Sequence, residues 1–267
     1  SHIRKLCRHK HPIIVGIAGS QGSGKSTHSN LLKSLLEQEH GLKTCILSID
    51  DVYLSREERR ELSESIHPLL VTRGVPATHD ITLAQQTLDA LSGADEHTSV
   101  ALPRFDKAID DPQPRDAWPK VAGPIDVVLF EGWCMGARPQ PAAALIEPVN
   151  PLEAQEDPDG QWRQHVNDAL AGAYSTLFGR LDMLIMLAAP SFEVVFGWRT
   201  KQEEALRART QPGRGTELMD ESALERFIMH YERITRAMLE ELPAYADCVV
   251  RLSEEQQPIS VSWKSAT

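Results

Sequence analysis

The sequence has little that would support a disulfide framework, a metal cluster or a membrane span. Its 267 residues include 4 cysteines, and no two of them form a CxxC pair. Such scattered cysteines are typical of the reducing cytoplasm, which is the location we expect. None of the 10 histidines is part of an HExxH motif. No apolar run approaches the roughly 18 residues that a membrane helix needs.

Basic residues are also scarce relative to acidic ones. The chain has 28 Lys and Arg against 38 Asp and Glu, which gives a formal charge of −10 at pH 7. A negative surface disfavours sequence-independent binding to nucleic acid or to anionic membranes, so we expect neither as a partner. It leaves room for a local basic pocket that binds a small anionic substrate. Hydrophobic residues make up 41% of the chain, an ordinary content for a globular protein.

Short apolar runs alternate with helical patterns along the chain. We expect strands at 13–18, 44–50, 99–102, 125–131, 183–188 and 246–252, and helices at 25–39, 57–63, 82–91, 161–178, 191–209 and 220–242. This alternation predicts an α/β fold, a parallel sheet with helices on both faces. No repeat or linker divides the chain, so we expect a single domain over 1–267. The Pro-rich stretches 103–119 and 138–158 are expected to be surface loops, with Glu153, Glu156 and Asp157 solvated.

A glycine-rich turn separates the first expected strand from the first long helix. Its sequence, GSQGSGKS at 19–26, matches the pattern GxxxxGK[ST] in full. Glycines let successive backbone N–H groups point at phosphate oxygens, and the following helix adds its positive N-terminal end. Lys25 then reaches the β and γ phosphates, and the Ser26 hydroxyl ligates Mg²⁺. The motif predicts binding of ATP with Mg²⁺ by Gly19, Ser20, Gln21, Gly22, Ser23, Gly24, Lys25, Ser26 and Thr27.

Carboxylates follow two other expected strands. The apolar run at 126–130 ends in Glu131, and the second strand ends in Asp50 and Asp51. The carboxyl ends of parallel strands border the ligand crevice, so Glu131 is placed to hold Mg²⁺, unless it is only a surface or capping residue. Strand alternation would turn Asp50 and Asp51 to opposite sides. We predict Asp50 as the base for an attacking hydroxyl, or as a Mg²⁺ partner.

These motifs together resemble a known group of enzymes. The segments GIAGSQGSGKST, SIDDVYL, TRGVPATHD, PRFDKAIDDPQP and VVLFEGW are similar to those of the P-loop small-molecule kinases, the superfamily of uridine kinase, phosphoribulokinase and pantothenate kinase. Within it, RGVPATHD and FIMHYERIT are most similar to the D-glycerate 3-kinase group. The resemblance spans about residues 12–252. It implies a P-loop NTPase fold with a helical lid, and phosphoryl transfer from ATP to a hydroxyl group.

The resemblance also implies roles for single positions. The catalytic acid of the family pattern QDxFY falls within IDDVY at 49–53, on Asp50, while Val52 stands where the family has an aromatic residue. The Glu of the family's EG pair corresponds to Glu131. The acceptor side of the site is then formed by residues of three segments: Asp51, Tyr53, Arg73, His79, Asp80, Arg104, Asp106 and Lys107.

The acceptor segments contain residues that suit a small acid. Arg binds a carboxylate through two hydrogen bonds, so Arg73 and Arg104 are candidates for that contact. Lys107 is a candidate for contact with the transferred phosphoryl group, and Asp80 and Asp106 for contact with substrate hydroxyls. The alternative is structural, because RGVP is a typical turn and His79-Asp80 would cap the next helix.

A basic stretch late in the chain suggests a lid at about 196–219. Arg199 and Arg207 lie on its expected helix, which leads into the turn QPGRG at 211–215. Closure would bring an arginine onto the developing charge of the phosphoryl group and exclude water, so both are predicted catalytic residues. The alternative is a solvated helix face on which these arginines pair with acids.

The sequence therefore favours an ATP-dependent kinase of a small hydroxyl-bearing metabolite, with D-glycerate as the first candidate. Pantothenate, a nucleoside or a sugar phosphate would keep the chemistry and change the acceptor. A nucleotide-dependent switch or regulatory ATPase is the alternative from another class. Such a switch would need guanine-reading residues or a water-positioning Gln after the Glu131 strand, and FEGWCMG at 130–136 offers neither.

Overall fold

The central sheet of the computed structural model has the spatial order β10-β9-β8-β1-β7-β2. The structure describes residues 2–8, 10–209 and 221–264, without the side chains of 202–209. Strands β1, β2, β7, β8 and β9 are parallel, and β10 runs antiparallel to β9 at one edge. Their bounds are β1 (Ile13–Gly19), β2 (Thr44–Ser48), β7 (Val127–Gly132), β8 (Met183–Ala188), β9 (Cys248–Leu252) and β10 (Pro258–Trp263). The expected α/β fold is thus confirmed.

Strand β1 lies in the middle of the sheet and is buried on both faces. Ile13, Val15 and Ile17 pack in a cluster with residues of the first two helices. Ile14 and Ala18, which alternate with them, belong to the larger core on the other face. Because side chains of a strand point alternately to its two faces, a run without polar residues is what a strand covered on both sides requires.

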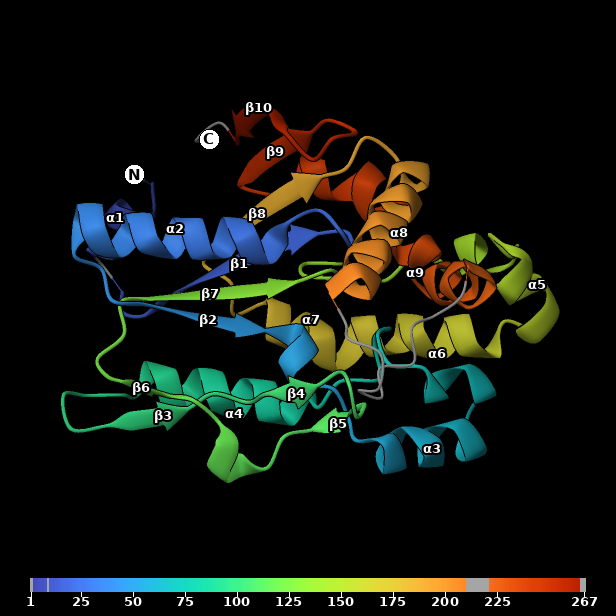
Figure 1. Cartoon of the computed structure of the whole chain (residues 1–267), viewed down its shortest axis with the longest axis horizontal. Coiled ribbons are helices and arrows are strands. Elements are labelled where there is room, and N and C mark those ends of the chain that lie inside the picture. The colour runs from blue at the N-terminus through green and yellow to red at the C-terminus, as the bar shows by residue number, and fades with distance from the viewer. Residues whose placement is uncertain (1, 9, 210–220, 265–267) are drawn as a thin grey trace.

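Helices cover both faces of the sheet and extend beyond its carboxyl end (Figure 1). Figure 1 shows α8 and α9 at the end toward which β7 and β8 point. Helix α2 ends where expected, at Gly41, whose backbone φ is 64°. The bounds are α1 (His2–Leu6), α2 (Lys25–His40), α3 (Arg56–Ser65), α4 (Ile81–Ser92), α5 (Pro151–Glu156), α6 (Gln161–Ala169), α7 (Ser175–Phe178), α8 (Phe192–Arg209) and α9 (Glu221–Glu241). Along the described residues, no helix combines the length and apolar character that a membrane crossing requires.

Two local expectations were wrong. Strand β2 ends at Ser48, and the following 3-10 turn, Ile49–Asp51, carries the two acids that we had placed in the strand. The Ser48 hydroxyl accepts a hydrogen bond from the backbone N–H of Asp50 at 3.3 Å, which begins the turn in place of further ladder bonds. The stretch 103–119 is also more than a loop. It contains the hairpin of β4 (Phe105–Asp106) and β5 (Asp111–Pro112), flanked by β3 (Ser99–Ala101) and β6 (Lys120–Ala122).

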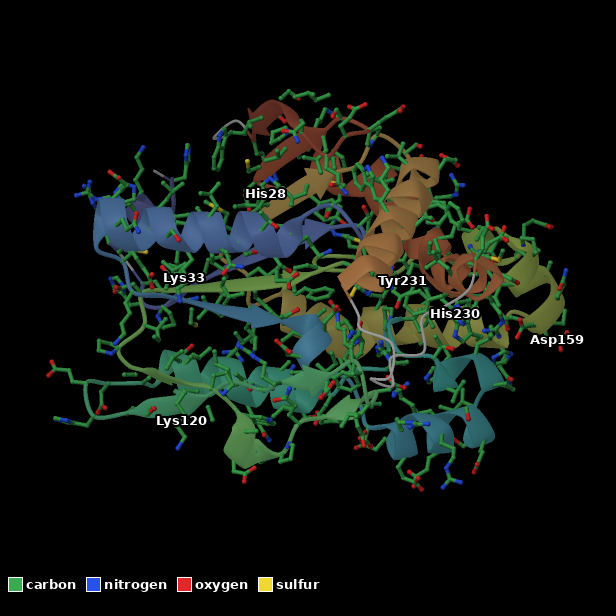
Figure 2. All side chains as sticks on the ribbon, in the orientation of Figure 1. His28, Lys33, Lys120, Asp159, His230 and Tyr231 are labelled. Carbon is green, nitrogen blue, oxygen red and sulfur yellow. The ribbon has the colours of Figure 1, made fainter. Side chains whose placement is uncertain are left out.

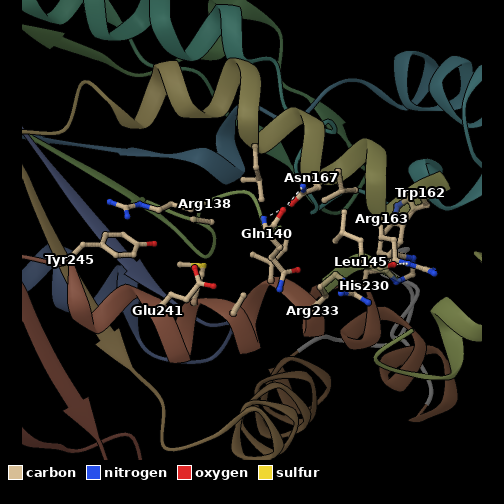
Figure 3. Close-up of a pocket in the computed structure, with 16 residues that line it drawn as sticks. Arg138, Gln140, Leu145, Trp162, Arg163, Asn167, His230, Arg233, Glu241 and Tyr245 are labelled. Carbon is tan, nitrogen blue, oxygen red and sulfur yellow. Dashed lines mark hydrogen bonds between the residues drawn. The ribbon is translucent and has the colours of Figure 1, made fainter. Parts of the chain in front are cut away.

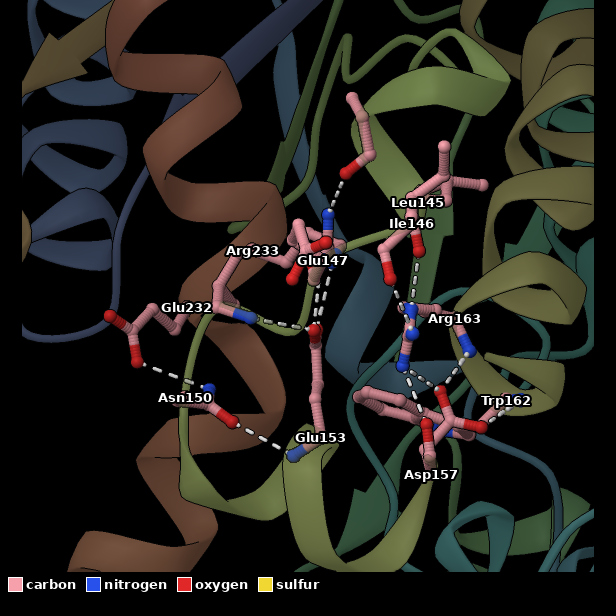
Figure 4. Close-up of polar contacts among 12 residues, drawn as sticks. Leu145, Ile146, Glu147, Asn150, Glu153, Asp157, Trp162, Arg163, Glu232 and Arg233 are labelled. Atoms are coloured by element: carbon pink, nitrogen blue, oxygen red, sulfur yellow. Dashed lines mark hydrogen bonds and ion pairs between the residues drawn. The ribbon is translucent and has the colours of Figure 1, made fainter. Parts of the chain in front are cut away.

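The stretch 138–158 is fixed by two buried arginines, drawn in Figure 4. Arg233 of α9 binds both carboxylate oxygens of Glu153, at 2.8 and 2.6 Å, and donates to the carbonyls of Ala144 and Glu147. Arg163 of α6 pairs with Asp157 at 3.0 Å. The expectation that Glu153 and Asp157 are solvated was therefore wrong, since they are 0% and 1% exposed. Arg233 is 80 residues from Glu153, so the local sequence gave no sign of that pairing.

Candidate active site

The glycine-rich turn 19–26 forms a backbone cradle between β1 and α2. Gly22 and Gly24 have φ values of 76° and 79°, a region that favours glycine. A Cβ atom on Gly22 would lie 2.7 Å from the Cβ of Trp198 in α8, so the turn also packs too closely for a side chain there. Helix α2 begins directly after the turn and directs its free N–H groups and positive end at the cradle. This is an anion-binding geometry.

Lys25, Ser26 and Glu131 meet beside the cradle. The Lys25 ammonium donates to the carbonyl of Ser20 at 3.0 Å. Burial lowers the pKa of Lys25, while the charges of Glu131 and Asp50 oppose that change. The Ser26 hydroxyl lies 3.5 Å from Oε1 of Glu131, and Glu131 is buried. A hydroxyl and a carboxylate side by side fit Mg²⁺, which takes one or two protein oxygens and fills its other positions with phosphate and water oxygens.

Asp50 faces the same space from the turn after β2. Its Oδ1 accepts from the Tyr53 hydroxyl at 2.8 Å, and its Oδ2 accepts from the Lys107 ammonium at 2.6 Å. Burial favours the protonated form of Asp50. The charge and hydrogen bond of Lys107, the charge of Lys25 and the hydrogen bond from Tyr53 together outweigh burial, so the pKa of Asp50 lies well below its ordinary value. Asp50 is therefore an ionised carboxylate with one hydrogen-bonded side chain on each oxygen.

A cavity of about 570 Å³ joins these groups. It is lined by these residues of the sequence prediction: Gln21, Gly22, Gly24, Lys25, Ser26, Thr27, Asp50, Tyr53, Arg73, Lys107, Glu131 and Arg199. The structure thus brings together residues from the glycine-rich turn, from both strand ends, from each of the three acceptor segments and from α8. The turn of the predicted lid at 211–215 lies outside the described residues, as does the side chain of Arg207.

The other predicted acceptor residues do not line this cavity, in the part of the chain that is described. Arg104 pairs with Asp51 at 3.1 Å. Asp80 accepts from the backbone N–H of Leu83 at 2.8 Å and caps α4, which is the capping alternative. Asp106 accepts from the N–H of Ala108 in its own hairpin.

His79 is buried behind the cavity wall. Its ring stacks on Tyr53 at a centroid distance of 4.5 Å, and its Nδ1 lies 2.6 Å from the Tyr174 hydroxyl. Burial lowers the pKa of His79 to about 3, against the opposing charge of Asp50, so its ring is neutral at physiological pH. His79 thus packs against Tyr53, whose hydroxyl donates to Asp50.

Several lining residues were missed by the sequence analysis: Trp133, Trp198, Lys201, Phe227, Tyr231 and Gln256. Phe227 and Tyr231 are four residues apart on α9 and so share one helix face, a spacing that could have indicated them. Figure 2 labels Tyr231 and the preceding residue His230, which lines a different pocket. Gln256 donates to the carbonyl of Gly22 at 2.7 Å. Nothing in the sequence around it links it to a turn so far away.

A second pocket lies between α6 and α9, on the side of α9 that carries His230 (Figure 3). None of the predicted site residues lines it. Its volume is about 20 Å³, which is close to the space that one water molecule occupies. The cavity at the glycine-rich turn is therefore the one of these two that has room for a nucleotide and an acceptor.

The parallel sheet, the cradle before α2 and the carboxylates at the carboxyl ends of β2 and β7 define a P-loop phosphotransferase. No family model matches the chain. The chain is 34% identical over 232 residues to the uncharacterized kinase mug58 of Schizosaccharomyces pombe, covering 82% of this chain and 78% of that one. It is 30% identical over 260 residues to the chloroplastic D-glycerate 3-kinase of Arabidopsis thaliana, which covers 93% of this chain and 54% of the plant protein.

A solved D-glycerate 3-kinase from Cryptococcus neoformans var. grubii has the same fold, with a TM-score of 0.78, 24% identity and 99% of each chain covered. The chain belongs to the P-loop small-molecule kinases, in the group that contains D-glycerate 3-kinase. It is an ATP-dependent phosphotransferase that acts on an alcohol group of a small metabolite.

Proposed function

We propose that the phosphoryl acceptor is a small hydroxy acid, with D-glycerate as the first candidate, and that Mg²⁺ accompanies ATP. One observation carries this proposal: Arg73 and Lys107 line the same cavity as the glycine-rich turn and Asp50. Two cations beside the proposed base suit an acceptor that has a carboxylate near its hydroxyl group. A neutral nucleoside would need neither. The name of the Arabidopsis relative supports the same class of acceptor.

In the proposed reaction, Asp50 accepts the proton of the acceptor hydroxyl at one of its carboxylate oxygens as that hydroxyl attacks. Mg-ATP, when bound, supplies the γ-phosphoryl group, and ADP is the leaving group. Lys25 and Arg199 line the cavity and neutralise charge that develops on the phosphoryl oxygens. Ser26 and Glu131 hold the metal. Tyr53 keeps Asp50 oriented through its 2.8 Å hydrogen bond.

Lys107 must loosen its contact with Asp50 before the acceptor hydroxyl can take that place. Its ammonium binds Oδ2 at 2.6 Å, and its side chain is 57% exposed, which leaves it free to move. We propose that the acceptor's carboxylate or the phosphoryl group draws Lys107 away. The pKa of Asp50 would then rise, because burial favours its protonated form and the opposing charge has moved. Asp50 thus becomes a better proton acceptor in the step in which the acceptor hydroxyl loses its proton.

Replacing Lys107 with methionine tests this role through the pH dependence of kcat/KM. Activity requires ionised Asp50, so the acidic limb of the profile follows the pKa of Asp50. Lys107 holds that pKa low. Its loss should raise the pKa, and the acidic limb should move to higher pH. Lys107→Arg keeps the charge and should keep the limb in place. An unmoved limb in Lys107→Met would contradict the role, and Lys120→Met, at an exposed strand residue, is the control.

A panel of acceptors tests the proposed substrate class. We expect ADP release in the presence of Mg-ATP and D-glycerate, and little without an acceptor. Pantothenate, uridine and ribulose 5-phosphate are the comparison acceptors, read out in the same coupled assay. Turnover of uridine in preference to either acid would refute the acid proposal. Rapid ATP hydrolysis that no acceptor stimulates would instead favour a regulatory ATPase.

A further inference from the structure

The turn between β4 and β5 places one carboxylate between two arginines. Asp110 in this turn has a backbone φ of 58°, in the left-handed region. Its Oδ2 lies 2.8 Å from an Nη atom of Arg59 in α3. Its Oδ1 accepts from an Nη atom of Arg73, which lines the nucleotide cavity. Asp and Asn tolerate such a φ better than other side chains, so both the backbone and the ion pairs suit aspartate here.

Arg59 is the fixed end of this arrangement. It is only 2% exposed, although it lies on a helix next to solvent-exposed residues. Its Nε donates to the carbonyl of Leu54, and its two Nη atoms donate to the carbonyls of Val71 and Asp110. A guanidinium held by three backbone carbonyls cannot turn to follow its partner. The position of the Asp110 carboxylate is therefore set by the protein and not by Arg73.

Arg73 is the end that faces the cavity. The Tyr231 hydroxyl donates to its carbonyl at 3.1 Å, which holds its backbone. Its guanidinium lies 5.7 Å from the centre of the Phe105 ring, and its side chain is 25% exposed. Among the described residues, Asp110 is the hydrogen-bond partner of the Arg73 guanidinium. A guanidinium has five N–H donors, so the contact with Asp110 leaves donors for a planar anion.

We propose that Asp110 is a positioning residue that aims Arg73 at the acid group of the acceptor. This assignment rests on the proposed function. Pre-organisation is the physical reason: a flexible arginine would lose side-chain freedom on binding, whereas this one has lost it already. Asp110 does not touch the acceptor itself, and it should therefore act on acceptor binding and not on the chemical step.

The test is the kinetics of Asp110→Asn with D-glycerate as acceptor. Loss of the charge weakens the hold on Arg73, so KM for the acceptor should rise about tenfold, the scale of a hydrogen bond to a charged group. We expect kcat and the KM for ATP to stay within about twofold. The matched control is Asp111→Asn, on the same hairpin, which removes the carboxylate that accepts from the N–H of Arg56 at 2.9 Å. Its KM for the acceptor should not change.

A second comparison separates positioning from a general structural role. In an Arg73→Met background, Asp110→Asn should have no further effect on the acceptor KM, because the group that it positions is absent. An additive effect in that background, or an unchanged KM in Asp110→Asn alone, would overturn this assignment while leaving the acid acceptor in place. If the wild-type protein phosphorylates a neutral acceptor and no acid, the proposed function fails first, and this assignment fails with it.

Discussion

Changing Asp50 to asparagine is expected to lower kcat by about 10²- to 10⁴-fold, the usual contribution of a positioned general base. Asparagine has nearly the same shape and can still accept from the Tyr53 hydroxyl, but it cannot take a proton from the acceptor. ATP binding should remain within a few fold, because Asp50 does not belong to the glycine-rich cradle. Steady-state kinetics and equilibrium titration with a fluorescent ATP analogue measure the two effects separately.

Two other variants make the Asp50 result specific. Lys25→Ala should weaken both ATP binding and turnover, because the ammonium belongs to the phosphate site. Asp116→Asn changes an exposed carboxylate outside the cavity and should leave both values unchanged. An Asp50→Asn variant that keeps full kcat would remove Asp50 as the base. The neighbouring Asp51, which pairs with Arg104, would then be the next acid to test.

Changing Glu153 to alanine is expected to destabilise the fold by about 3–5 kcal/mol, because it leaves the buried guanidinium of Arg233 without its carboxylate. The two side chains are 1% and 8% exposed and share two hydrogen bonds. For a chain of this size, Tm should fall by roughly 10 °C. Thermal unfolding followed by circular dichroism measures the change.

Helix α5 supplies its own control for this experiment. Glu156 pairs with Arg226 of α9 at 2.6 Å, again through two hydrogen bonds, but these side chains are 41% and 47% exposed. Glu156→Ala should cost only about 0–1 kcal/mol, because water screens the pair. Equal losses of stability in Glu153→Ala and Glu156→Ala would show that burial does not determine how much these ion pairs contribute to stability. Replacing Glu153 with leucine together with Arg233→Met should recover part of the stability. No buried charge then stays unpaired, but the carbonyls of Ala144 and Glu147 lose the donor that Arg233 provides.

The sequence predicted the groups whose position follows from local pattern. The apolar run before the glycine-rich turn and the helical pattern after it are both visible in the sequence. The place of the turn between a buried strand and a helix was therefore predictable. Glu131 and Asp50 follow strand ends, and the carboxyl ends of parallel strands gather at one edge of the sheet. The boundary of β2 was wrong by two residues, because a hydrogen bond from the Asp50 N–H to the Ser48 side chain replaced the ladder.

The sequence did not predict contacts between segments that are distant along the chain. Arg104 was expected to bind the acceptor, and the structure pairs it with Asp51, a partner that only the fold brings near. Asp110 was not singled out, because an acid in a turn is usually a solvated turn residue. Gln256 lies in a segment without a motif, and its contact with Gly22 depends on the sheet order. Pairings of this kind need the tertiary structure.

The sheet order has a consequence for the folding of the nascent chain. β1 is synthesised before its two neighbours in the sheet, β7 and β8, which follow more than 100 residues later. Until then both edges of a fully apolar strand lack their hydrogen-bond partners, a state that promotes aggregation and chaperone binding. The contact of Gln256 with Gly22 forms later still. The phosphate cradle is therefore among the first parts of the site to be synthesised and among the last to be completed.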